Sequence, residues 1–172
     1  MLKLRKNKKG FTLVELIVVI AIMAVLAGVV AGVTVSQLNK QTDKTGATQA
    51  NTVASFISEC ALTGDEPATQ IVKSTSVTEG DTTTDKNVFI VKKVKDLITA
   101  QYTAASIPVE NTTNNTIGNT KRQVYITFGK EPGTGDDATA DTVIVTYKPK
   151  ASGTKTTTFT INADGVVTKS EA

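Results

Sequence analysis

The sequence predicts an α+β protein, in which a long N-terminal α-helix forms the spine of a C-terminal head built on an antiparallel β-sheet. Apolar residues run almost without a break from position 11 to position 35. Beyond this run they recur at the spacing of one helical stripe, at Val53, Phe56, Ile57 and Cys60. After position 123 apolar and polar residues alternate with the period of two that indicates half-buried strands. Helix and sheet are therefore expected in separate parts of the chain.

The predicted helix runs from Phe11 to Leu62. No proline interrupts this interval, and Thr63 and Gly64 follow it as a stop signal. Residues 11–35 form its transmembrane or filament-core half, and residues 36–62 form an amphipathic half that supports the head. Gly46 is expected to weaken the second half, because an interior glycine costs about 1 kcal/mol relative to alanine.

Residues 63–172 are predicted to form the globular head. Its first part, residues 63–86, is rich in Thr, Ser, Asp and Glu and shows little periodicity. We expect a surface loop there, with room for a short strand at 70–72. Residues 87–101 are predicted to form a short helix with one apolar face, made by Val88, Val91, Val94, Ile98 and Tyr102.

Three or four antiparallel strands complete the predicted head. Their apolar positions are Val124, Ile126 and Phe128, then Val143, Val145 and Tyr147, then Phe159 and Ile161, then Val166 and Val167. Turn residues separate them at 131–135, 148–153 and 162–165. The apolar face of this sheet is expected to pack on the helical stripe from Val53 to Cys60.

Composition excludes several classes of function. The 172 residues include a single cysteine, Cys60, so no internal disulfide can form. Histidine, the commonest general base and metal ligand, is absent. We therefore expect no enzyme, no catalytic residue and no cofactor. Asp136, Asp137 and Asp141 offer oxygen ligands for calcium, but the ordered ligand spacing of a calcium loop is missing, and a solvated acidic turn is the preferred interpretation.

The formal charge of +3 comes from the start of the chain, where five basic residues and no acid stand within the first ten positions. The remaining residues hold 14 basic and 16 acidic side chains, which gives a net charge of −2. Without residues 1–10 the protein is no polycation, and general nucleic-acid binding is not predicted.

The segment from 11 to 35 is long enough to span a membrane, because about 20 apolar helical residues cross the hydrocarbon core. The basic residues before it place the N-terminus in the cytoplasm and the head across the membrane. A secretory signal peptide is disfavoured, since its apolar region usually has about 7 to 15 residues. An ordinary anchor leaves Glu15 unexplained, because a carboxylate inside a membrane costs about 2.5 to 3.5 kcal/mol.

The residues Lys8-Lys9-Gly10-Phe11-Thr12-Leu13-Val14-Glu15, followed by the apolar run, resemble the class III signal of type IV prepilins. This resemblance covers residues 1–40 closely and the remainder only in architecture. It implies that residues 1–10 are a leader peptide, that a prepilin peptidase cleaves between Gly10 and Phe11, and that the new amino group of Phe11 is methylated. It also implies that Glu15 pairs with that amino group of a neighbouring subunit during assembly.

The resemblance further implies a type IV pilin-like fold and a structural role in a type IV pilus or a similar filament. The partners would be other pilin subunits, the prepilin peptidase, the membrane, and the assembly platform with its ATPases. The precursor would be a single-pass membrane protein, and the assembled subunit would be extracellular.

Several alternatives stay open at this stage. The chain can be a pseudopilin of type II secretion or of competence, or a singly anchored extracytoplasmic domain that never polymerises. Many relatives close a C-terminal loop with a disulfide, and its absence here fits a Gram-positive subunit or a pseudopilin stabilised in another way. Adhesion, twitching motility, DNA uptake and secretion are not distinguished by the sequence, nor is a major subunit from a minor one.

Overall fold

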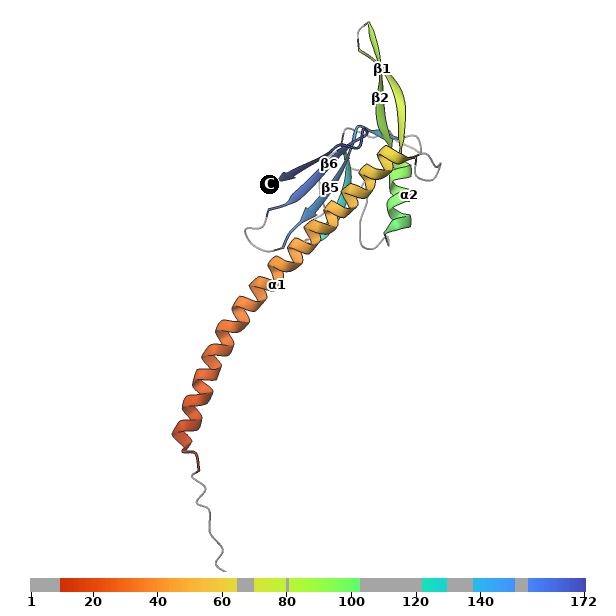
Figure 1. Ribbon diagram of the computed structural model, residues 1–172. Coiled ribbons are helices and arrows are strands. Elements are labelled where there is room, and N and C mark those ends of the chain that lie inside the picture. The colour runs from red at the N-terminus through yellow and green to blue at the C-terminus, as the bar shows by residue number, and fades with distance from the viewer. Residues whose placement is uncertain (1–9, 65–69, 80, 103–121, 130–137, 151–154) are drawn as a thin grey trace, which may run out of the picture. The chain divides into compact units, whose positions relative to one another are not determined.

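The computed structural model describes residues 10–64, 70–79, 81–102, 122–129, 138–150 and 155–172 (Figure 1). The chain divides into two compact units, Met1–Asn39 and Lys40–Ala172, and each is described by itself. The described elements, in chain order, are α1 (Leu13–Thr63), β1 (Val72–Glu79), β2 (Thr82–Ile90), α2 (Val91–Gln101), β3 (Gln123–Gly129), β4 (Thr139–Ala140), β5 (Thr142–Lys148), β6 (Thr157–Asn162) and β7 (Val167–Glu171).

The first unit contains the apolar beginning of α1. The chain is helical from Leu13 onward, and Gly28 and Gly32 do not interrupt the helix. Almost every side chain from residue 13 to residue 38 is exposed, although most of them are aliphatic. A helix that is apolar on all sides and has no core to pack against needs either lipid or other helices around it.

In the second unit, α1 is amphipathic. Its buried residues are Asp43, Ala50, Val53, Ala54, Ile57 and Cys60. Phe56, which was expected on the buried stripe, is only half-buried and meets the ring of Tyr102 edge to face, with 6.2 Å between the ring centroids. The centre of the buried stripe is therefore formed by Val53, Ala54 and Ile57, and Phe56 lies at its edge.

The four-stranded antiparallel sheet has the order β3-β5-β6-β7 and confirms the predicted fold class. Alternate residues of β5 and β6, including Val143, Val145, Phe159 and Ile161, are buried in one core with the α1 stripe. This helix followed by antiparallel sheets is an α+β arrangement like that of type IV pilins. The predicted turn at 162–165 is present, where the amide of Gly165 donates to the carbonyl of Asn162 over 3.0 Å.

A second sheet, β1-β2-β4, corrects the expectation of a loop over residues 63–86. β1 and β2 form an antiparallel hairpin whose register runs from Val72↔Phe89 to Glu79↔Thr82. Among the hairpin side chains that the structure describes, Val88 and Phe89 at its base are the buried ones, and the first six residues of β2 are exposed. A hairpin that is polar on both faces shows no apolar alternation, so the sequence pattern missed it.

The short helix begins later than expected. Residues 87–90 belong to β2, and α2 starts at Val91. Ile90 is extended, and its amide donates to the carbonyl of Ile71 over 2.7 Å, which fixes the strand end. The rest of the predicted face is present, since Val91, Val94 and Ile98 are buried.

A buried carboxylate joins α1 to the four-stranded sheet. Asp43 is 2% exposed and accepts hydrogen bonds from the Tyr147 hydroxyl over 3.0 Å and from the Lys150 amide over 3.2 Å. The Nε atom of Arg122 lies 3.7 Å from the same carboxylate oxygen. Burial, the hydrogen bond to Asp43 and the negative charge of Asp43 raise the pKa of Tyr147 to about 12. These contacts link α1 to β5 through Tyr147, and to the residues directly before β3 and after β5 through Arg122 and Lys150.

The raised pKa predicts a loss of stability at alkaline pH. A pKa above the ordinary tyrosine value means that the folded head holds the Tyr147 proton more tightly than the unfolded chain does. The stabilisation is complete below about pH 10 and is lost as the pH rises toward 12, by roughly 2 kcal/mol. We expect urea unfolding of the full chain in detergent micelles to show this fall. Tyr147→Phe should be less stable at neutral pH, and its free energy of unfolding should fall less steeply as the pH rises from about 10 to 12. Equal falls in the two proteins would contradict the expectation.

Candidate functional site

The residues on either side of the expected cleavage point lie before the helix and are accessible. Gly10 and Phe11 are not helical, and Phe11 is 92% exposed. A Cβ atom added to Gly10 would meet nothing within 4 Å. No crowding among the described residues therefore requires glycine at this position.

Glu15 closes a capping box at the start of α1. The amide and the hydroxyl of Thr12 each donate to Glu15 Oε2 over 2.8 Å, and the amide of Glu15 donates to the Thr12 hydroxyl oxygen over 3.3 Å. This reciprocal pattern of threonine and glutamate three residues apart satisfies amides that the first helical turn leaves unpaired. The signal Thr-x-x-Glu stood in the sequence, but the role of Thr12 was missed because Glu15 was interpreted only as an assembly residue.

The helix that follows is long and apolar enough to cross a membrane, judged by length and composition. Its exposed large side chains include Leu16, Ile17, Ile20, Ile22, Met23, Leu26, Val29 and Val30. Burying one such side chain is worth about 1.5 to 3 kcal/mol, so this surface strongly favours lipid or a bundle of like helices over water. Open space surrounds Gly28 and Gly32, where another helix can approach closely.

The described residues offer no group of three or more metal-ligating side chains of the His, Cys, Asp and Glu types. Asp141, one of the considered calcium ligands, forms an ion pair with Lys86 at 3.0 Å, and Asp136 and Asp137 lie outside the described residues. Cys60 is a free, buried thiol, and burial raises its pKa above the ordinary value. A raised pKa lowers the thiolate fraction and hence the reactivity of the sulfur.

Residues 5–31 match the family model of the prokaryotic N-terminal methylation motif, which is the class III signal peptide of type IV pilins. No curated protein and no solved structure matches the chain. The matched interval contains Gly10, Phe11 and Glu15, the three residues to which the sequence assigned processing and assembly. The motif supports a type IV pilin-like or pseudopilin precursor, and the apolar helix is consistent with membrane anchoring of that precursor.

Proposed function

We propose that this protein is the structural subunit of a type IV pilus or pilus-like filament and has no catalytic role of its own. The observation that carries the proposal is the combination of the methylation motif with an apolar helix that lacks any covering among the described residues. A subunit whose helix leaves the membrane must bury this surface again, and a bundle of identical helices provides that burial.

Each candidate residue has a distinct role in this proposal. The prepilin peptidase cleaves the leader, residues 1–10, at the exposed junction between Gly10 and Phe11, and the amino group of Phe11 is then methylated. Residues 11–35 anchor the precursor with its N-terminus in the cytoplasm and later form the filament core. Glu15 pairs with the Phe11 amino group of a neighbouring subunit, so each charge offsets the other inside the apolar bundle. The assembly platform and its ATPases supply the work of extrusion.

Mass spectrometry of the N-terminus tests the processing step. We expect the wild-type chain, taken both from the cell envelope and from sheared surface material, to begin at methylated Phe11. Gly10→Val places a branched side chain where the peptidase must approach the backbone, so this variant should accumulate as a precursor that retains Met1 and should yield no filaments.

Gly28→Val is the matched control, because it adds the same side chain at a helical glycine with open space around it and far from the junction. It should be cleaved like the wild type. An intact Met1 in the wild-type envelope would reject the proposal in favour of a singly anchored domain that never polymerises. A chain cut at Phe11 but absent from sheared material would instead favour a pseudopilin.

A further inference from the structure

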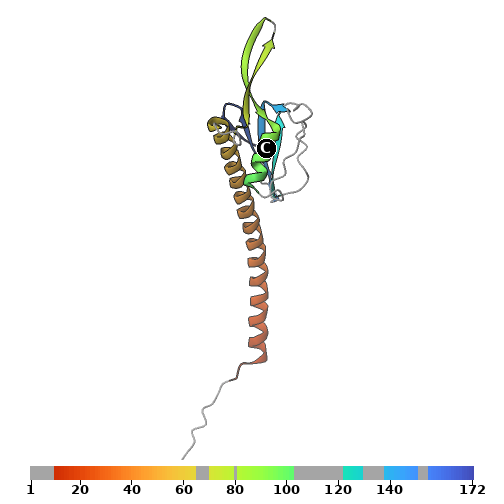
Figure 2. The same cartoon turned by 90° about the vertical axis from the view of Figure 1, so that its right-hand side faces the viewer.

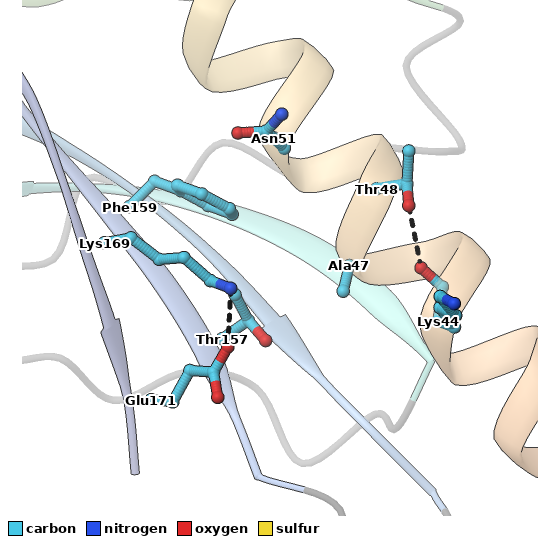
Figure 3. Close-up of a pocket in the computed structure, with 8 residues that line it drawn as sticks. All are labelled: Lys44, Ala47, Thr48, Asn51, Thr157, Phe159, Lys169 and Glu171. Carbon is cyan, nitrogen blue, oxygen red and sulfur yellow. Dashed lines mark hydrogen bonds and ion pairs between the residues drawn. The ribbon is translucent and has the colours of Figure 1, made fainter.

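An open groove with lysines at its edge lies between α1 and the free edge of the four-stranded sheet (Figure 3). Two adjoining hollows of about 420 and 370 Å³ form it and share Lys44, Ala47, Thr157 and Glu171. We call it the lysine groove. Thr157 and Phe159 are buried at its floor, while the side chains of the edge strand β7 are all exposed.

The groove carries positive charge, whereas residues 11–172 as a whole have a net charge of −2. Four lysines line it, namely Lys40, Lys44, Lys155 and Lys169, together with the acidic Glu171 and the buried Asp43, which is engaged by Tyr147 and Arg122. Lys169 is neutralised by an ion pair with Glu171 at 2.6 Å. Within the described part of the chain, no carboxylate pairs with Lys40 or Lys44, and both side chains are exposed. These two lysines are therefore available to an anionic partner.

The β1–β2 hairpin is the most prominent projection of the second unit, and it extends beyond the rest of that unit in both views (Figures 1 and 2). The strands end at its tip with the pair Glu79↔Thr82, and the exposed Asp81 lies between them. Two other charged residues of the hairpin have partners nearby, since Asp85 accepts a hydrogen bond from Ser76 and Lys86 pairs with Asp141. The tip therefore presents the exposed acid Asp81.

The hairpin and the lysine groove lie at opposite ends of the second unit. The groove is lined by α1 residues 40–51, whereas the base of the hairpin lies beside the other end of α1, where Ile71 and Val72 line a hollow with Cys60 and Leu62. Lys44 and Leu62 are separated by about 27 Å along the helix axis. Complementary surfaces at opposite ends of one subunit can join successive copies head to tail, and such heterologous contacts build an open polymer when the rotation between copies does not close a ring.

We infer that the hairpin tip of one copy of this chain docks into the lysine groove of another copy, with Asp81 facing Lys40 and Lys44. This inference rests on the proposed filament function and specifies which surfaces of two neighbouring heads meet. The occupant is a second copy because the acidic tip is exposed, projects from the same chain, and is presented repeatedly by neighbouring subunits in a filament. Opposite charges at such an interface fix which surfaces meet and in which register.

Charge reversal with reciprocal rescue tests the contact in whole cells that express the full chain. Lys44→Glu and Asp81→Lys should each lower the yield of sheared filaments about tenfold, because each sets like charges against each other across the interface. The double variant restores opposite charges in exchanged places and should return the yield to within about twofold of wild type. Both positions are exposed, so neither change disturbs the core of the head.

Lys95→Glu is the matched control, since it makes the same charge change on α2, away from the groove. It should leave the yield within about twofold of wild type. A double variant as poor as the single variants, or a control as poor as Lys44→Glu, would overturn the docking contact. In either of those cases the wild type still forms filaments that begin at Phe11, so the proposed function stands. A wild type that forms no filaments would remove both.

Disulfide trapping gives a second readout that does not depend on yield. One copy carries Thr48→Cys at the groove and a co-expressed copy carries Asp81→Cys at the tip. Mild oxidation of sheared filaments should link the two copies, and replacing the groove cysteine by Thr99→Cys on the exposed side of α2 should abolish the link. Equal linkage through Thr99→Cys would show that the tip has no preferred site.

Discussion

Gly46→Val should unfold much of the head at temperatures where the wild type is folded. A Cβ atom at Gly46 would overlap the ring of Tyr147, which is 2% exposed and cannot swing into solvent without leaving the core. Moving the ring would also break the hydrogen bond from Tyr147 to the buried Asp43. Overpacking of this kind and the loss of a partner for a buried charge together cost about 3 kcal/mol or more.

Limited proteolysis of the full chain in detergent micelles, across a urea series, measures this loss. Gly46→Ala gives the more informative comparison, because alanine normally stabilises a helix by about 1 kcal/mol relative to glycine. We expect the opposite sign at Gly46, and no effect on the head from Gly32→Ala, where the added methyl group meets open space. The penalty should shrink when Tyr147→Leu removes the ring that causes the overlap. A gain in stability for Gly46→Ala would show that helix propensity outweighs this contact.

Gly46 is a residue whose role could not be predicted from the sequence. Its local sequence shows only a glycine that weakens a helix, whereas the need for glycine comes from the ring of Tyr147, about a hundred residues further along the chain. The same holds for Asp43, which reads as one more polar residue in a polar stretch until Tyr147, Lys150 and Arg122 surround it. Contacts between distant segments leave no local pattern, so the sequence predicted neither the contact of Gly46 with Tyr147 nor the buried position of Asp43.

Elements with a local signal were predicted well. The helix was expected over 11–62 and is observed over Leu13–Thr63, because an unbroken apolar run, an amphipathic stripe and a glycine stop signal all lie within it. β3, β5 and β6 were found by their alternation, whereas all side chains of the edge strand β7 are exposed, and Val166 and Val167 do not pack in the core as expected. The hairpin was not found, since its polar residues give no apolar alternation and its stability depends on backbone pairing and on the buried base at Val88 and Phe89.

The residues proposed for processing and assembly also have a local signal in the sequence. Gly10, Phe11 and Glu15 stand within six positions of one another, and the matched motif includes them all. The capping partner Thr12 was equally local and was visible in Thr-x-x-Glu. The cap was not predicted, although threonine and glutamate three residues apart are its sequence signature.

Because Glu15 caps α1 and is also proposed to pair with the Phe11 amino group of a neighbouring subunit, the change that separates these two roles carries the largest expected effect on assembly. Glu15→Gln keeps an amide oxygen that can accept from the Thr12 amide and hydroxyl, so the helix start is retained. It removes the negative charge, and the Phe11 amino group of the neighbouring subunit then stays unpaired inside an apolar bundle. Leaving one partner of a buried ion pair uncompensated costs about 3 to 5 kcal/mol at each subunit, so filament yield should fall more than tenfold.

Thr12→Val is the reciprocal control, because it removes the hydroxyl from the cap and keeps the Glu15 charge. Loss of an N-cap side chain costs about 1 kcal/mol, so the yield of filaments should fall far less than with Glu15→Gln. Mass spectrometry should find both variants cut at Phe11, which separates an assembly defect from a processing defect. If Glu15→Gln assembled like the wild type while Thr12→Val did not, the cap rather than the charge would be the property of Glu15 that the filament requires.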